Sequence, residues 1–525
     1  MTNHFKNALF NINNPEVSPR FWETVFWGVS LVYCLCWFVL PLVTMNNLRP
    51  DSLEITFMGK EWILSSNKHP AMAPWLIEIA LMLTGRAAWA PYLVSQIAVL
   101  TVLWCIWTLS KEYLPRHLAF LVVVVSMNYR YLNIGSLMFH PSIAILPFWA
   151  LSVVSVYYAF KTNRLLYWVL TGLFIACGMQ CKYPMALLAM TLLLFVFVFR
   201  EARRYRTGAA ITVAVAFFVF LPQLLWLVQH DFSTLKYATQ LAENQKSWVS
   251  HLFAPLVSAL NQAALLIAVV IPLIPLASWR WRVHEEHWKD PSLLKMRFLF
   301  FIVVVPVGIQ LLLSAIGGAN LRAGLGTHLW LFFPLLLVYG IRMNFDPTRL
   351  KTAFTLSVSV SLVTMVIFMG TYQLRFLFNE TPNNTDMPGR QLAVQVEKIW
   401  HDRHSTGAQP TPLLYVAGGW ELGANVAFYG KDRPTVLQTH DRWGLDNTPP
   451  LPMTWASDDD LNTHGGIVLW RIFADNELVP SLLNDRFPEA EILEKSLSIP
   501  FQYRRECPPL RVGIAIIPPS DLSAH

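Results

Sequence analysis

The polar segment from residue 49 to residue 75, RPDSLEITFMGKEWILSSNKHPAMAPW, follows the first apolar run of the chain. Its charged and titratable side chains include those of Asp51, Glu54, Lys60, Glu61, Lys68 and His69. A carboxylate here could act as a general base on a hydroxyl, and the cations could hold a phosphate. The alternative is a solvated loop with ordinary interfacial charges, because charge runs are usually hydrated faces.

Asp51 is the candidate base in this segment. It lies just outside the apolar run, where a base for an acceptor hydroxyl must be open to substrate. The alternative is an interfacial acid or the cap of a helix that begins near Ser52. Glu54 would share a helical face with Asp51 and is either a second acid or a plain helix charge. Lys60 and His69 are the candidate phosphate contacts of this segment.

Three cationic or titratable residues outside this segment are also candidates. His140 precedes Pro141 at the start of an apolar run, and a helix N-terminus favours anions. Lys182 ends another apolar run, and an ionisable residue at membrane depth is a functional candidate by default. Arg322 adds fixed positive charge, which a lipid-linked phosphate needs. The alternatives are a satisfied polar histidine and a lysine that snorkels to the interface.

The elements that carry these residues are apolar runs. The chain has 525 residues, of which 54% are hydrophobic and 14% are charged, whereas soluble domains carry about 25% charged residues. We therefore expect a polytopic α-helical membrane protein with about 11 spans. Five runs have both ends defined, at about 22–44, 89–109, 209–228, 298–315 and 352–372. The other six are defined by where they end, near residues 132, 160, 180, 200, 279 and 342.

The distribution of positive residues predicts the orientation. With a cytoplasmic N-terminus, the inner loops carry most of the cations, as in REARRYR at 200–206 and RWRVHEEHWKD at 280–290. This orientation places residues 49–75, 128–140, 229–248 and 317–330, and Lys182, on the outer side. All these polar segments therefore meet on one face of the membrane.

The composition changes after Tyr372. We expect two domains, a membrane domain at 1–372 and a soluble α/β domain at 373–525 on the outer side. Apolar runs at 412–418, 433–438, 465–470 and 511–518 predict strands, and residues 420–429 and 476–487 predict helices.

Several functional classes are excluded or left without support. The net charge of +7 lies at the ends of spans, where it sets topology, so no nucleic-acid partner is expected. The sequence has no Cys or His cluster with zinc spacing, no P-loop and no nucleophile elbow. A divalent metal is possible, but the carboxylates and histidines on one side form too thin a ligand set to argue for one.

Several segments together resemble the C-type-fold integral-membrane glycosyltransferases, families 39 and 83 of the protein mannosyltransferase superfamily. The lipid A aminoarabinose transferases are the most useful comparison within it. The similar segments are RPDSLEITFMGKEW at 49–62, HPAMAPW at 69–75, IGSLMFHP at 134–141, CGMQCKYP at 177–184, PQLLWLVQHDFSTLKY at 222–237 and GTHLWLFFPLLL at 326–337. The resemblance covers about the first 370 residues.

The resemblance implies residue roles. Asp51 takes the place of the catalytic aspartate, His69 that of a phosphate-contacting residue, and Lys182 that of the lipid-phosphate lysine. His140 stands where the family commonly has a second acidic residue. Either Asp51 acts without that second acid, helped by Glu54, or the acceptor and metal dependence differ. Residues 1–372 would then be the transmembrane glycosyltransferase domain of a protein in the cell inner membrane. The outer side, with the soluble domain at 373–525, would be the periplasm.

The implied activity is transfer of a sugar from a polyprenyl-phosphate donor, undecaprenyl phosphate in a bacterium, to a periplasmic acceptor. The acceptor would be lipopolysaccharide, lipid A or another envelope glycan, and membrane lipids would surround the spans. One alternative is a transporter or flippase for a lipid-linked sugar, although the sequence shows no internal repeat. Another is a catalytically inactive relative that binds lipid. The sequence identifies neither the sugar nor the acceptor.

Overall fold

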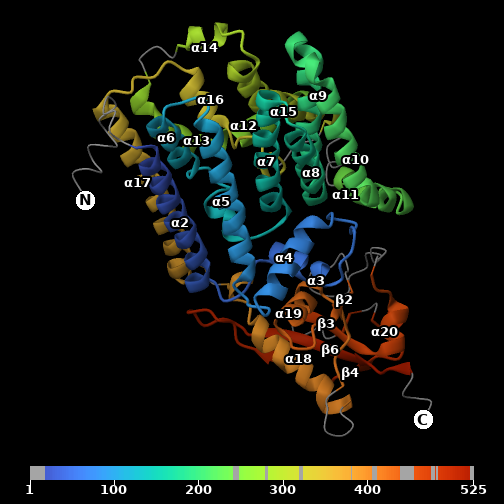
Figure 1. Cartoon of the computed structure of the whole chain (residues 1–525). Helices are drawn as coiled ribbons and strands as arrows, with labels where there is room; N and C mark the ends of the chain where they lie inside the picture. Colours follow the sequence, from blue (N-terminus) through green and yellow to red (C-terminus); the bar gives the residue numbers. More distant parts are fainter. Residues whose placement is uncertain are drawn as a thin grey trace. The chain divides into compact units, whose positions relative to one another are not determined.

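The computed structural model describes residues 18–240, 248–277, 282–318, 323–379, 381–404, 411–437, 455–473, 479–480 and 483–520 (Figure 1). The chain divides into two compact units. The first comprises residues 1–40 and 92–368, and the second comprises residues 41–91 and 369–525. The break at residue 368 lies close to the composition change in the sequence, but the polar segment after the first apolar run belongs to the second unit.

The first unit is a bundle of helices. Its helices are α2 (Pro19–Thr44), α5 (Ala90–Ser110), α6 (Arg116–Ser126), α7 (Pro141–Thr162), α8 (Leu165–Cys181), α9 (Ala186–Val198), α10 (Arg206–Gln229), α11 (Ser233–Gln240), α12 (Trp248–Ala264), α13 (Ile267–Val270), α14 (Glu285–Lys289), α15 (Phe298–Gly317), α16 (Phe333–Gly340) and α17 (Pro347–Leu374). Short tight helices include η2 (Tyr183–Met185), η3 (Arg200–Tyr205) and η6 (Ala323–Leu325).

Six helices among the described residues are long and apolar enough to cross a membrane, and a seventh span results if a helix pair bent by 43° counts as one. This confirms the predicted polytopic helical membrane fold. The third, fifth, sixth and tenth expected runs form the shorter helices α6, α8, α9 and α16. α8 ends at Cys181 because Lys182 is extended and Pro184 follows two residues later.

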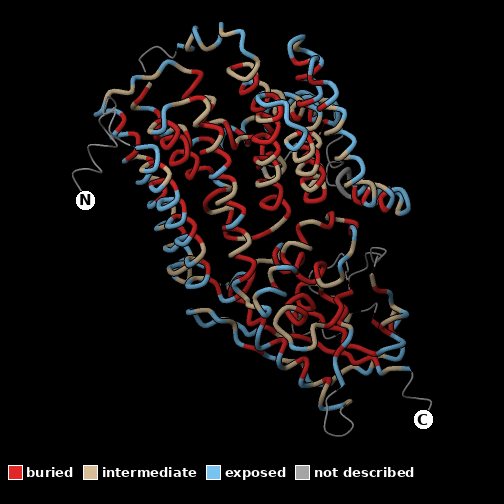
Figure 2. The backbone as a smooth tube through the Cα atoms, viewed as in Figure 1, coloured by how far each residue is buried: buried red, intermediate tan, exposed pale blue. Residues whose placement is uncertain are grey.

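Burial differs strongly between these helices. α7 is buried along most of its length, whereas α10 and α17 expose long apolar faces (Figure 2). On α10 the exposed side chains include Phe217, Phe218 and Leu225. Apolar side chains exposed along a whole helix are what a lipid-facing span requires.

The second unit combines the polar segment with a sheet. Its helices are α3 (Pro50–Lys60), α4 (Met72–Leu83), α18 (Gly389–His404), α19 (Trp420–Tyr429), α20 (Asp458–His464) and α21 (Leu483–Arg486). Its strands are β1 (Tyr415–Gly418), β2 (Thr435–Val436), β3 (Gly466–Ile472), β4 (Glu491–Ile492), β5 (Leu497–Ile499) and β6 (Leu510–Ile517). The predicted α/β domain is thus confirmed, and the described part of the expected helix at 476–487 is α21.

The sheet has the order β2-β1-β3-β6-β4, and β5 pairs with β6. β1 is parallel to β2 and β3, whereas β3 and β6 are antiparallel. Val468, Trp470 and Ile472 of β3 face a core completed by α20 and α21, while the alternate residues Ile467 and Leu469 are also buried. Strands buried on both faces explain why β3 and β6 read as continuous apolar runs.

α19 follows β1 through a turn and packs on β1, β2 and β3, and both α3 and α18 pack on α19. α4 packs on α3. The segment that carries Asp51 and Glu54 is therefore held as a layer against the helix that covers the sheet.

Candidate functional site

α3 begins where the sequence favours a helix start. Pro50 occupies the first helical position and Asp51 lies in the first turn, where proline needs no hydrogen-bond partner and an acid is favourable. From Ser52 to Gly59 every residue of α3 is buried, because α4 and α19 cover it. Asp51 itself is exposed. The helix therefore presents one open carboxylate at its start and buries residues 52–59.

Glu54 lies one turn after Asp51, and it is buried, with 2% of its side chain exposed. Lys68 donates to both of its carboxylate oxygens, at 2.8 Å to Oε1 and 2.7 Å to Oε2. His69 Nε2 lies 3.7 Å from Oε2. Burial raises the pKa of Glu54, but the hydrogen bond from His69 and the charges of Lys68 and His69 outweigh it and lower the pKa to about 2. Glu54 is therefore ionised at neutral pH and holds two cationic or titratable groups beside it.

The turn between α3 and α4 brings these partners together. Ser66 donates through its Oγ to the carbonyl of His69 at 3.1 Å and accepts from the His69 amide at 2.9 Å. Ser65 and Pro70 form an isolated bridge in the same turn. The Lys68 ammonium also lies 6.0 Å from the centre of the Trp420 ring on α19, within reach of a cation–π attraction. The turn therefore fixes Lys68 and His69 against Glu54.

Lys60 ends α3 away from this cluster. Its ammonium donates to the carbonyl of Arg433 and to Thr435 Oγ1 at 3.1 Å, and it lies 3.6 Å from Glu61 Oε1. Burial lowers the pKa of Lys60. Arg433 in turn forms a two-pronged ion pair with Glu78 of α4, at 3.0 and 2.8 Å. The structure therefore gives Lys60 a fastening role between α3 and β2.

In the first unit, Lys182 follows α8 and donates to Ser142 Oγ at 2.7 Å and to the carbonyl of Gly324 at 2.8 Å. Ser142 lies in the first turn of α7, and His140 is the half-buried residue that precedes that helix. The structure thus places the Lys182 ammonium at the N-terminal end of α7, the helix that His140 precedes. Arg322 lies outside the described residues.

The buried His328 was missed by the sequence analysis, although the segment that contains it was noted. Its ring lies 4.4 Å from that of Trp149, and neither ring nitrogen has a hydrogen-bond partner among the described residues. Thr327 beside it donates to the carbonyl of Ser142 at 3.2 Å. The N-terminal end of α7 therefore contacts both Lys182 and the segment that contains His328.

Lys68 was also missed as a site residue, although it stands directly before the His-Pro pair. The signal for it is its position in the turn, one residue before a titratable side chain and fourteen residues after Glu54. Glu78, Arg433 and Thr435 carry no local signal, since their partners come from distant parts of the sequence.

The sequence leaves open whether a divalent metal takes part. No group of three or more His, Cys, Asp or Glu residues within the described ranges could hold a metal ion. The Glu54 carboxylate, the most enclosed acid of the polar segment, has Lys68 and His69 as its neighbours instead of further anionic ligands. Metal ligands for a hard cation would be oxygen atoms.

The comparisons with known proteins agree with this architecture. Residues 68–226 match the family model described as dolichyl-phosphate-mannose-protein mannosyltransferase. The structure of ArnT from Cupriavidus metallidurans bound to undecaprenyl phosphate is similar with a TM-score of 0.60 and 12% identity, over 96% of this chain and 99% of that one. The apo structure of the same ArnT gives a TM-score of 0.50 and 12% identity, over 95% and 98% of the two chains. A search of curated proteins found no match.

At this level of identity the likeness to ArnT concerns the fold. It extends over nearly the whole of both chains, so it includes the second unit as well as the helices. The match to the mannosyltransferase model begins at Lys68 and ends at Trp226, and thus contains His69, His140 and Lys182. The chain is a multi-pass membrane protein with the C-type fold of the integral-membrane glycosyltransferases, as its sequence segments indicated.

Proposed function

We propose that this protein is a glycosyltransferase that moves a sugar from a polyprenyl-phosphate donor to a hydroxyl of an envelope acceptor. The observation that carries the proposal is the environment of the two acids on α3. Asp51 is open, whereas Glu54, one turn later, is buried against Lys68 and His69. Paired acids in contrasting environments are a recurring basis for assigning different catalytic roles. The mannosyltransferase match and the ArnT-like fold support the same activity.

In this proposal Asp51 is the catalytic base. It accepts the proton of the acceptor hydroxyl, whose oxygen then attacks the anomeric carbon of the sugar. The bond from that carbon to the phosphate oxygen breaks, and the polyprenyl phosphate leaves with the electron pair. The acceptor is lipopolysaccharide, lipid A or another glycan, and the sugar is a hexose or pentose.

Positive charge near the leaving phosphate is the second requirement, because preorganised cations stabilise charge that develops in the transition state. Lys68 and His69 supply it in the polar segment, held in place by Glu54. Glu54 acts in this scheme as a positioning residue. Lys182 remains a predicted phosphate contact from the sequence resemblance, His140 from its position at a helix start, and Arg322 from its charge. Lys60, also a predicted phosphate contact, fastens α3.

We place the reaction on the periplasmic side of the cell inner membrane, with the N-terminus in the cytoplasm. The basis is the positive-inside rule applied to the basic loops. Cysteine labelling of Leu64 and of Thr207 variants from outside intact cells tests this, because both positions are exposed. The Leu64 variant should react only after the outer membrane is made permeable, and the Thr207 variant only after lysis.

The test of the activity is mass spectrometry of envelope lipids and glycans from cells with the wild type, without the gene, and with Asp51→Asn. We expect one glycan species to lose a single sugar in the deletion and in Asp51→Asn alike, at unchanged protein level. Asp459→Asn is the matched control, because Asp459 is also an exposed acid in the first turn of a helix. It should retain the sugar.

The opposite result separates the alternatives. If the deletion changes the envelope while Asp51→Asn preserves it, Asp51 is not the base, and a lipid-linked sugar transporter or a lipid-binding scaffold explains the phenotype. The mass lost in the deletion identifies the sugar class in either case.

A further inference from the structure

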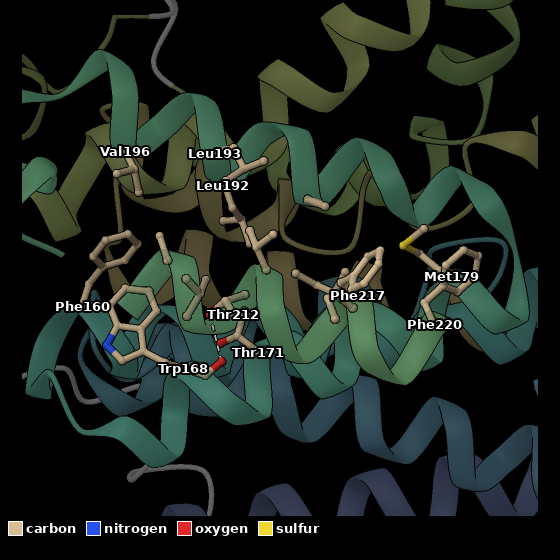
Figure 3. Close-up of a pocket in the computed structure, with 16 residues that line it drawn as sticks. Phe160, Trp168, Thr171, Met179, Leu192, Leu193, Val196, Thr212, Phe217 and Phe220 are labelled. Atoms are coloured by element: carbon tan, nitrogen blue, oxygen red, sulfur yellow. Dashed lines mark hydrogen bonds between the residues drawn. The ribbon is translucent and has the colours of Figure 1, made fainter. Parts of the chain in front are cut away.

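An apolar groove runs along the helices α8, α9 and α10 of the first unit (Figure 3). Its volume is about 240 Å³. Phe160, Trp168 and Val196 lie at one end, and Met179 and Phe220 lie at the other. Nothing in the proposed transfer reaction uses this groove.

The groove results from unequal helix packing. α10 approaches α8 closely at two glycines: a Cβ on Gly172 would lie 2.5 Å from the carbonyl oxygen of Thr212, and one on Gly208 would lie 2.3 Å from Trp168 Cε2. α9 has far fewer contacts with either helix. A channel therefore stays open beside α9, and it faces the side on which α10 exposes Phe217 and Val213.

The lining calls for an apolar occupant. Its hydroxyl groups are already satisfied, since Thr171 donates to the carbonyl of Tyr167 at 2.7 Å and Thr212 to that of Trp168 at 2.9 Å. From Trp168 to Met179 the helix rises about 16 Å at 1.5 Å per residue. This is close to half of the roughly 30 Å hydrocarbon core of a bilayer, the depth of one leaflet.

The end at Trp168 has a basic rim, which we define as Arg164, Arg200, Arg203, Arg204 and Arg206. All five are exposed, and they precede α8 or lie on η3 and the start of α10. The guanidinium groups of Arg164, Arg200 and Arg206 have no hydrogen-bonded or ion-paired partner among the described residues. The acid within this stretch, Glu201, lies 3.5 Å from Arg297.

We propose that the groove and the basic rim together bind an anionic phospholipid of the leaflet that faces η3. One acyl chain lies in the groove, and the headgroup phosphate contacts the rim arginines. Charge complementarity selects this occupant, because basic pockets between membrane helices favour anionic headgroups. Lys182 follows α8 three residues after Met179, but it does not line the groove and its ammonium already donates to Ser142 and Gly324. The five arginines are therefore the stronger phosphate site.

The test is native mass spectrometry of the full-length protein in detergent. The probes are dioleoyl phosphatidylglycerol, dioleoyl phosphatidylcholine and undecaprenyl phosphate. We expect phosphatidylglycerol to be retained over phosphatidylcholine. Arg200→Gln with Arg206→Gln should weaken that retention about 10- to 30-fold, as expected when two basic residues leave an anionic lipid. Arg282→Gln with Arg342→Gln is the matched control, because both residues are exposed and lie outside the groove and its rim.

A second pair of variants tests the groove itself. Ala209→Phe should fill it and abolish retention, whereas Ala210→Phe, at the next position but outside the lining, should not. All variants must keep the wild-type thermal unfolding midpoint. Equal retention of the two phospholipids overturns the proposal. So does retention of undecaprenyl phosphate that Ala209→Phe blocks and the arginine variants leave intact, since the groove would then hold the donor chain.

Discussion

Replacement of Glu54 by glutamine should loosen α3 without leaving a cavity. The pKa of Glu54, lowered to about 2, corresponds to about 3 kcal/mol relative to the ordinary value, at 1.36 kcal/mol per pKa unit. Breaking a buried ion pair costs about 3–5 kcal/mol, but Lys68 is partly exposed and can recover hydration. We therefore expect Glu54→Gln to lower the local stability of α3 by about 2–3 kcal/mol.

Hydrogen–deuterium exchange with mass spectrometry measures this quantity. A change of 2–3 kcal/mol corresponds to about 30- to 150-fold faster exchange of the α3 amides at neutral pH, where local opening limits exchange. Glu285→Gln is the control, since Glu285 pairs with Lys289 on the surface and such pairs contribute little. Equal protection of α3 in wild type and Glu54→Gln would refute the argument.

The stability that Glu54 contributes should depend on pH in a defined direction. Because folding lowers the pKa of Glu54, its contribution to stability is complete above the unfolded value of about 4.3 and is lost as the pH falls toward about 2. The protection of α3, corrected for the intrinsic exchange rate, should therefore become the same in wild type and Glu54→Gln as the pH approaches 2. A difference that stays constant over this range would assign the effect to something other than the charge of Glu54.

Two further changes test how the second unit is held together. In chemical denaturation, Glu78→Gln and Arg433→Met should each lower the free energy of unfolding by about 3–5 kcal/mol, because each single variant leaves a buried charge without its partner. The double variant should lose clearly less than the sum of the two single losses. Additive losses would contradict the pairing. Gly418→Ala should prevent stable folding in thermal unfolding or expression assays, since φ is 92° and the Cβ would lie 2.0 Å from the Leu469 carbonyl oxygen, whereas Gly370→Ala, with nothing within 4 Å, should be neutral.

The sequence predicted those parts of the fold that local patterns determine. The long spans follow from apolar runs, and β1, α19, β3 and β6 follow from buried runs with a glycine turn between β1 and α19. α18 and α20 were not predicted. α18 is strongly polar on one side and carries His401, Arg403 and His404 in its last turn. The many polar residues make the segment hydrophilic on average, although one face of the helix is apolar and buried.

The candidate site was predictable in kind but not in its contacts. Acids and cations in residues 49–75 suggested a base and a phosphate site, and Asp51 is open as that role requires. The ion pair of Glu54 with Lys68 depends on the turn between α3 and α4, and the fastening of Lys60 depends on β2, whose Thr435 lies 375 residues away in sequence. Such partners are set by tertiary packing, which a single sequence does not encode locally.

Replacing the two acids of α3 should consequently give different phenotypes. This difference distinguishes a catalytic role of Asp51 from a positioning role of Glu54. Asp51→Asn removes an exposed carboxylate, so transfer should stop while the exchange protection of α3 stays at the wild-type level. Glu54→Gln should reduce protection and transfer together, because Lys68 and His69 lose the group that holds them. If Asp51→Asn lowered protection as much as Glu54→Gln, Asp51 would be a structural helix-start residue. If Glu54→Gln stopped transfer with full protection, Glu54 would act directly in the reaction.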